Sequence, residues 1–246
     1  MAQIRTHGPE VKLDEPFFVE GFPGVGLVGK IATDHLIKTF DMRYYASVQC
    51  EGLPRIGVYR DGNRTVMPPV RMYVSESENL LALQSDLPIA AGAVDTVAGC
   101  LTAWLRDQDV RPIYLSGYPA ERDGVPELYA VATGGADEIL EEHSIDRPTE
   151  DGAVSGPTGA LLNHAAQLEF DSVCLVVESN PQFPDPEAAR VLIEDGVAPI
   201  ADLDVDVSDL VDHAAEIRQQ REQLAQRMQE VDQEESSQAR PMQMYQ

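Results

Sequence analysis

The first segment whose residues could do chemistry is a glycine-rich turn near the N-terminus. Gly24 to Lys30 fits seven positions of a phosphate-binding P-loop, G-x-x-x-x-G-K, but Ile31 stands where the loop needs Ser or Thr for magnesium. Gly24, Gly26 and Gly29 also fit the dinucleotide pattern G-x-G-x-x-G, yet no acidic residue closes the next expected strand. The sequence therefore favours a structural turn, in which glycines permit a close approach of strand and helix.

A second glycine turn has the sequence SGPTG and begins at Ser155. Backbone amides at Gly156 and Gly159, with the Thr158 hydroxyl, suit an anion at the start of a helix. Helix capping by Ser155 or Thr158, with Pro157 in the first turn, explains the same residues. If the two glycine turns lie together, they predict one site for a nucleoside, nucleotide or phosphate.

The chain end carries a third candidate site, Met244, Tyr245 and Gln246. A terminal carboxylate, a tyrosine ring with its hydroxyl and an apolar methionine suit capture of a C-terminus in a basic pocket. Pro241 and the polar residues 234–240 before it predict a flexible tail over 234–246. A simple frayed end is the alternative.

A seven-residue repeat precedes this tail and predicts a helix over 201–233. Its apolar positions are Val207, Leu210, Ala214, Ile217, Leu224, Met228 and Val231, and Arg221 interrupts them. The repeat indicates either a coiled-coil seam between copies of the chain or an amphipathic helix lying on its own domain.

The sequence contains no recognisable pattern for a catalytic nucleophile or a metal site. The five histidines lack metal-ligand spacing, Ser116 and Ser155 each have only one glycine of the G-x-S-x-G elbow, and the three cysteines lie far apart. We therefore expect no catalytic residue, no metal and no cofactor.

The net charge of the chain indicates which classes of partner it can bind. Eighteen Lys and Arg against 42 Asp and Glu leave a net charge of −24, with only three lysines. Such a surface repels nucleic acid and anionic membranes, and it is typical of proteins from salt-loving microbes. No apolar run is long enough to span a bilayer, so we expect a soluble cytoplasmic protein.

Hydrophobic periodicity predicts an α/β domain over 1–200, a sheet with helices on both faces and an antiparallel meander in its first half. The expected strands are 17–19, 43–50, 56–60, 65–74, 80–84, 112–116, 126–132 and 172–177. The expected helices are 27–40, 92–108, 137–143, 157–168 and 187–194.

Three segments carry a resemblance to a known family. They are VEGFPGVGLVG from Val19 to Gly29 with Ala32 after it, GPTGALL from Gly156, and CLVVE from Cys174 followed by Pro181 and Pro184. Over roughly residues 10–200 the sequence resembles the archaeal branch of the proteasome assembly chaperone 2 family. The resemblance implies a nucleoside phosphorylase-like fold without its catalytic residues, homo-oligomers, and a role in assembly of the proteasome core particle. Older ATP-dependent ligase labels in that family are not supported here, because Ile31 follows Lys30.

The same resemblance gives the chain end a role. Related archaeal proteins end in a hydrophobic residue, tyrosine and any residue, which dock between α subunits of the proteasome ring. Met244 would be the hydrophobic position, Tyr245 the tyrosine, and Gln246 the donor of the free carboxylate. The leading hypothesis is an ATP-independent assembly chaperone or adaptor. A small-molecule binding protein or enzyme using both glycine turns, and a scaffold that only self-assembles, are the alternatives.

Overall fold

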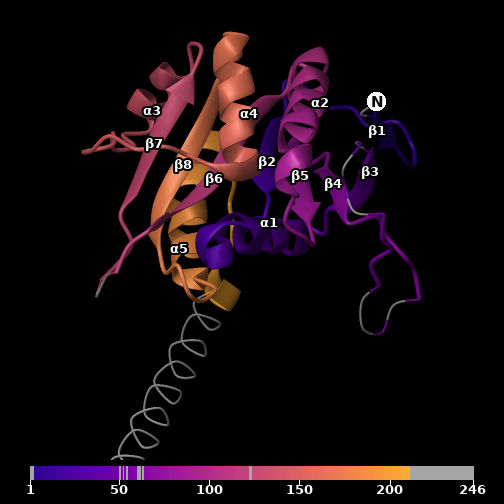
Figure 1. Ribbon diagram of the computed structural model, residues 1–246, viewed down its shortest axis with the longest axis horizontal. Helices are drawn as coiled ribbons and strands as arrows, with labels where there is room; N and C mark the ends of the chain where they lie inside the picture. Colours follow the sequence, from indigo (N-terminus) through magenta and orange to yellow (C-terminus); the bar gives the residue numbers. More distant parts are fainter. Residues whose placement is uncertain are drawn as a thin grey trace, which may run out of the picture.

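A computed structural model describes residues 3–210 of the chain, except positions 50, 52, 54, 60, 61, 63, 122 and 123. These residues fold around an eight-stranded sheet with the order β1-β3-β4-β5-β2-β6-β8-β7 (Figure 1). The strands are β1 Gln3–Thr6, β2 Phe17–Gly21, β3 Arg43–Gln49, β4 Val70–Ser75, β5 Leu80–Ser85, β6 Arg111–Pro119, β7 Leu128–Thr133 and β8 Ser172–Ser179. The helices are α1 Val28–Thr39, α2 Val94–Asp107, α3 Asp137–Glu142, α4 Gly156–Gln167, α5 Pro186–Val191 and α6 Ala198–Ala201.

The middle of the sheet is parallel and its margins are antiparallel. β2 pairs in parallel with both β5 and β6, and β6 pairs in parallel with β8. β3, β4 and β5 form the antiparallel meander that the sequence predicts, while β1 and β7 cover the two edges. The predicted α/β class is confirmed, and the carboxyl ends of β2, β6 and β8 meet at one edge of the sheet.

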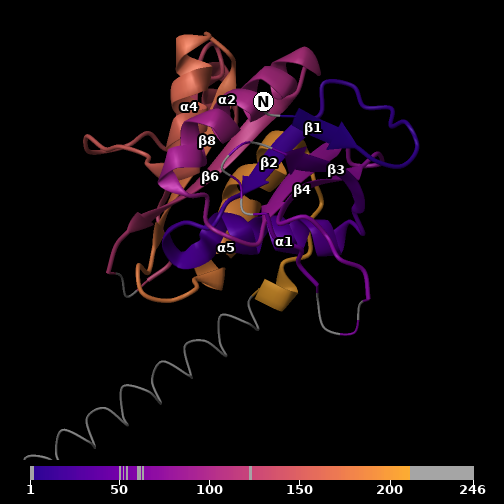
Figure 2. The same ribbon diagram turned by 45° about the vertical axis from the view of Figure 1, so that its right-hand side comes forward.

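Helices cover both faces of the sheet. α1 and α5 pack together on one face, and α2 and α4 pack together on the other (Figures 1 and 2). β8 shows why the sequence requires this arrangement: Val173, Leu175 and Val177 are buried under α1 and α5, while Cys174 and Val176 are buried under the other pair. A strand with apolar side chains on both faces must be covered twice.

Helical spacing of apolar side chains fixes the docked face of each long helix. Val97, Leu101 and Leu105 recur at intervals of four residues in α2 and are all buried. In α1 the buried stripe includes Ala32 and Leu36. Each stripe faces the sheet, so burial of this apolar surface sets the orientation of the helix.

The structure corrects the predicted strands between β3 and β4. The predicted strand at 65–74 begins only at Val70, because Pro68 and Pro69 lack the N–H groups that a ladder requires. In the described part of 56–60, pairing is limited to one antiparallel bridge between Val58 and Met67. The segment 55–67 is called here the β3–β4 arm. It projects from the sheet at the lower right of Figure 1.

Two further differences lie near the ends of the described chain. β1 was not predicted from the sequence, and it extends the sheet by pairing with β3. The helix predicted at 187–194 is longer: α5 continues through a π-helical turn, Leu192–Val197, into α6. Gly196 in that turn lies against Leu175, where an added Cβ would come within 2.5 Å of a leucine methyl carbon.

Candidate functional site

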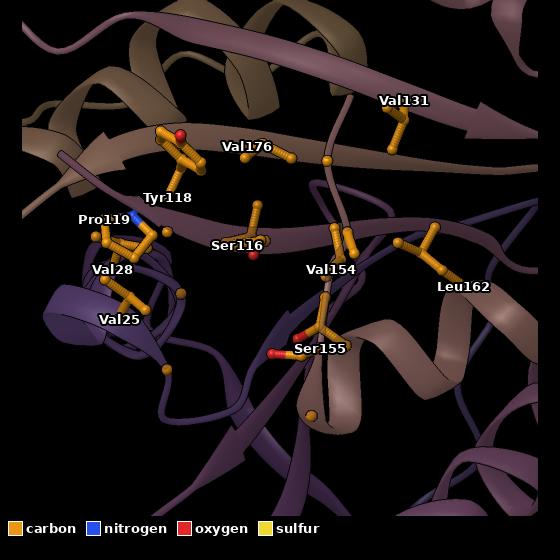
Figure 3. Close-up of a pocket in the computed structure, with 18 of the residues that line it drawn as sticks. Val25, Val28, Ser116, Tyr118, Pro119, Val131, Val154, Ser155, Leu162 and Val176 are labelled. Atoms are coloured by element: carbon orange, nitrogen blue, oxygen red, sulfur yellow. The ribbon is translucent and has the colours of Figure 1, made fainter. Parts of the chain in front are cut away.

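The two glycine turns lie on either side of β6 and share an open pocket of about 1340 Å³. Figure 3 shows Val25 of the first turn and Val154 beside the second turn on opposite sides of Ser116 in β6. Other lining groups include Phe22, Gly29, Gly117, Tyr118, Tyr129, Thr149, Glu150, Asp151, Gly156, Thr158 and Val176. The two motifs therefore lie in one pocket, although they are more than a hundred residues apart in the sequence. That this pocket binds a ligand stays a prediction.

A buried carboxyl group joins the strand before the first turn to the second turn. Glu20 is fully buried in β2, and its Oε1 accepts a hydrogen bond from Thr158 Oγ1 at 2.6 Å. Its Oε2 accepts from the backbone N–H of Phe22 at 2.9 Å. Because Phe22 and Thr158 both line the pocket, the hydrogen bonds of Glu20 connect the two walls of the site.

Among the described residues, the hydrogen-bond donors to Glu20 are all neutral, so no positive charge offsets the effect of burial on its pKa. Desolvation raises the pKa of Glu20 to about 7, against the opposing hydrogen bonds from Thr158, Phe22 and the backbone of Leu115. Burial raises the pKa of the neighbouring Tyr114 and Cys174 side chains, and the charge on Glu20 raises both further. The Tyr114 hydroxyl is buried and has no hydrogen-bond partner among the residues that the structure describes. Glu20 is thus the group in this cluster that changes charge near neutral pH.

The first glycine turn is packed against the protein itself. Gly26 has φ of +59°, and an added Cβ would lie 1.8 Å from Ser179 Oγ. Its carbonyl oxygen accepts a hydrogen bond from the backbone N–H of Asp185 at 2.8 Å. The next residue, Leu27, is also left-handed, with φ of +53°. The glycine at position 26 is therefore required by the contact with β8 and the start of α5.

Lys30, the basic residue of the P-loop-like pattern, belongs to a polar network away from the pocket lining. Its Nζ donates to Asp34 Oδ2 at 2.7 Å, and Asp34 Oδ1 accepts from Gln84 Nε2 at 2.5 Å. Gln84 Oε1 in turn accepts from the guanidinium of the buried Arg71. Asp34 therefore links α1 to β5 and β4, and Lys30 pairs with Asp34 inside α1, a role that needs no phosphate.

The second glycine turn starts α4 without a side-chain cap. Ser155 occupies the N-cap position, but its hydroxyl makes no capping hydrogen bond, and the Thr158 hydroxyl donates to Glu20. The structure confirms Ser155 at the N-cap position and Pro157 in the first turn, but the predicted capping by a side-chain hydroxyl is wrong. Gly156 has φ of +67°, and a Cβ on Gly159 would lie 2.2 Å from the Val154 carbonyl oxygen. Both glycines are needed for the tight turn.

The charge of the pocket decides which ligands it suits. Within the described chain, its lining contains Glu150 and Asp151 but no lysine, arginine or histidine. The remaining side chains are apolar, aromatic or hydroxyl-bearing, with Tyr118 and Tyr129 the largest. A phosphate would therefore meet no opposite charge here, whereas an apolar group accompanied by a cation is complementary to the site.

The structure describes two residues of the predicted seam. Val207 and Leu210 are buried in the core beneath α1, and Lys38 of α1 pairs with Asp209 at 2.5 Å. The other seam residues, Ala214, Ile217, Leu224, Met228 and Val231, lie outside the described residues, as do Met244, Tyr245 and Gln246. The helix predicted from residue 201 is wrong over 203–207, which are not helical, and helix is present at 208–210. Both described seam residues pack on their own domain.

The described residues hold no group of three or more His, Cys, Asp or Glu side chains arranged to hold a metal ion. No helix among the residues that the structure describes is long and apolar enough to cross a bilayer.

The sequence patterns did not indicate a role for Glu20. The available signal was an acidic residue inside the otherwise apolar segment FFVEG, which became the central strand. A carboxylate at such a position is buried and requires hydrogen-bond donors. The identity of Thr158 as a donor could not be read from the sequence, because the two residues are 138 positions apart.

Known proteins match this chain in sequence and structure over nearly its whole length. The chain is 26% identical to Pyrococcus furiosus PbaA, described as an archaeal homolog of proteasome-assembly chaperone, with a TM-score of 0.78 over 98% of this chain and 99% of PbaA. P. furiosus PbaB, described as an archaeal proteasome activator, gives a TM-score of 0.79 at 24% identity over 91% and 98% of the two chains. An uncharacterized protein of Methanocaldococcus jannaschii is 25% identical over 88% of each sequence. The model of the PAC2 family matches residues 18–225, and the chain therefore belongs to the PAC2 family.

Proposed function

We propose that this protein is a cytoplasmic, ATP-independent proteasome assembly chaperone or adaptor that acts as a homo-oligomer. The observation that carries the proposal is the likeness to PbaA, which extends over 98% of this chain at 26% identity. Membership of the PAC2 family supports the same role. The packed first glycine turn and the engagement of Lys30 with Asp34 support a function that does not depend on nucleotide binding.

The partner in this proposal is the α-ring of the proteasome core particle. Met244 would fill an apolar recess, the Tyr245 ring would stack and donate from its hydroxyl, and the Gln246 carboxylate would pair with a basic side chain of an α subunit. Several tails on one oligomer would bind the ring with higher avidity than a single tail.

The test removes residues 244–246 and measures binding to purified α-ring by surface plasmon resonance at the salt concentration in which the protein is stable. We expect the deletion to weaken binding at least about tenfold, because it removes the aromatic anchor and the carboxylate together. Unchanged binding would contradict the docking role.

Three matched variants separate the contributions at the chain end. Tyr245→Ala removes the ring, and one alanine added after Gln246 moves the carboxylate without removing any side chain. Both should weaken binding, whereas Gln243→Ala should not. Light scattering on every variant checks that the oligomer is intact, so that lost avidity is not mistaken for a lost contact.

The pocket favours a second candidate, a small-molecule binding protein built on both glycine turns. Its volume of about 1340 Å³ would accommodate a nucleoside, and Tyr118 and Tyr129 offer rings for stacking. Thermal shift against nucleosides, nucleotides, inorganic phosphate and aromatic cations tests it, because a ligand that binds only the folded state raises the melting temperature. The acidic lining predicts a larger shift with the cations than with the phosphates.

A further inference from the structure

The β3–β4 arm exposes large apolar side chains that the core does not use. Tyr59 is 78% exposed, Val66 62% and Ile56 47%. The arm is held in shape by the backbone bridge between Val58 and Met67, with both N–O distances at 2.8 Å. Gly57 lies so close to Val66 that an added Cβ would come within 2.4 Å of a valine methyl carbon. A shaped arm that displays apolar groups to water is typical of an interaction element.

The arm is also basic in a strongly acidic protein. Residues 55–67 contain Arg55, Arg60 and Arg64 against the single acidic residue Asp61, while the whole chain has a net charge of −24. Arg55 and Arg64 are exposed in the described structure. The segment therefore combines apolar side chains, an aromatic ring and positive charge.

The pocket between the glycine turns has the complementary character. Apolar and aromatic groups such as Val25, Tyr118 and Tyr129 line it, and Glu150 and Asp151 lie on its acidic side. An adjoining hollow adds Glu127, Asp146 and Glu178, together with Arg147, which pairs with Glu141 and Asp137 of α3. The lining thus suits an occupant that brings apolar bulk together with arginine.

Within one copy the arm does not fill this pocket. No described residue of the arm lines it, and the arm follows β3 near one margin of the sheet, whereas the pocket lies at β6 with β8 and β7 beyond it. Both features nevertheless project from the edge where the parallel strands end, as Figure 1 shows for the arm. The arm of a second copy can therefore reach the pocket from this edge, where the sheet of the first copy does not stand in the way.

We propose that the β3–β4 arm of one copy docks in the pocket between the glycine turns of a second copy, with Tyr59 among the tyrosines and with Arg55 and Arg64 against Glu150 and Asp151. Each copy carries both an arm and a pocket, so repeating the contact either pairs two copies reciprocally or closes a ring. This inference assigns the self-association surface and does not rest on docking of the chain end to the proteasome.

The first test measures self-association by sedimentation velocity at constant salt. Tyr59→Glu with Val66→Asp should raise the dissociation constant at least about tenfold, since aromatic anchors dominate such interfaces. Leu168→Glu is the matched control, because Leu168 is 44% exposed but lies at the end of α4, outside the arm and the pocket lining. Circular dichroism checks that each variant is folded.

A charge exchange tests the pairing directly. Arg55→Glu with Arg64→Glu, and separately Glu150→Arg with Asp151→Arg, should each weaken self-association, and mixing the two variants should restore a mixed complex. The proposal would be overturned if the oligomer persisted in both arm variants. It would also be overturned if the oligomer dissociated only when charged residues replaced Ile217 and Leu224.

A photo-crosslinking amino acid at position 59 identifies the occupant of the pocket. In a mixture of ¹⁴N- and ¹⁵N-labelled protein, we expect cross-links that join a light chain to a heavy chain at residues 117–131 or 148–162. Cross-links within one chain only, cross-links to residues 211–246, or a protein that is monomeric at every concentration would each contradict the assignment.

Discussion

Arg71 and Glu20 are fully buried ionisable groups on opposite faces of the sheet, and their surroundings differ. On the α1 face, Arg71 is 1% exposed and donates to Tyr73 Oη at 2.9 Å, to the Pro68 carbonyl oxygen at 2.7 Å and to Asp86 Oδ2 at 2.5 Å, as well as to Gln84. On the α4 face, Glu20 is completely buried and meets only neutral donors. One group has a counter-ion and the other has none.

The difference decides which group responds to pH. Burial alone would lower the pKa of Arg71, but its hydrogen bonds to Asp86 and Tyr73 and the charge on Asp86 raise the pKa above its usual value, so the arginine stays charged. Glu20 has no such partner, and desolvation raises its pKa to about 7. A buried charge with a counter-ion is a fixed part of the structure, whereas a buried acid among neutral donors makes stability depend on pH.

The largest expected effect comes from Arg71→Met, which keeps the volume but removes every donor. It leaves Asp86 and Gln84 without their buried partner, so we expect the free energy of unfolding to fall by about 3–5 kcal/mol. Urea denaturation followed by circular dichroism measures this. Asp86→Asn is the matched control, because it keeps a carbonyl acceptor while removing the charge and should cost less.

The next effect in size is a change of pH dependence in Glu20→Gln. Folded Glu20 holds its proton up to a pKa of about 7, whereas the unfolded group releases it near 4.5, so raising the pH between these values favours unfolding. The wild type should therefore lose up to about 3 kcal/mol of stability over this range relative to the variant.

Denaturation of both proteins at several pH values between about 5 and about 8 gives this difference profile directly. Other titrating groups cancel, since they are common to both chains. Parallel profiles would mean that Glu20 does not titrate in this range, and the contrast with Arg71 would then be lost.

The smallest effect is expected for Thr158→Val, which removes the hydroxyl donor to Glu20 Oε1. Above about pH 8 the charged carboxylate loses a hydrogen bond, so the free energy of unfolding should fall by about 1–2 kcal/mol. At about pH 5 the carboxyl is protonated and the loss should be smaller. Thr158→Ser keeps the hydroxyl and should behave like the wild type. An equal loss at both pH values would point to packing as the cause.

Periodicity predicted the parts of the fold that depend on local pattern. Strands such as β8 and helices such as α2 were found to within a few residues, because their buried positions recur at regular intervals. The strands predicted at 56–60 and 65–74 were only partly right, because Pro68 and Pro69 delay the start of β4 to Val70 and the arm pairs through the single described bridge between Val58 and Met67. β1 was missed because a four-residue edge strand has too little pattern to detect.

The candidate site was predictable only in outline. The glycine turns were recognised, and the missing Ser or Thr at Ile31 already weighed against a phosphate cradle. The polar contacts that define the site were not visible, since Glu20 meets Thr158 and Lys30 connects through Asp34 to Gln84 only in the folded chain. Pairings of this kind follow from topology, which local pattern does not encode.

The central place of β2 has a consequence for synthesis of the protein. β2 is made early, but its neighbours are β5 and β6, in which Leu80 and Arg111 stand opposite Phe17. Thr158 arrives later still, so a nascent chain carries Phe17, Phe18 and the charged Glu20 in water until most of the domain has left the ribosome. Folding that waits for such distant contacts is slow and exposes an aggregation-prone strand, so the newborn chain itself should need protection from aggregation.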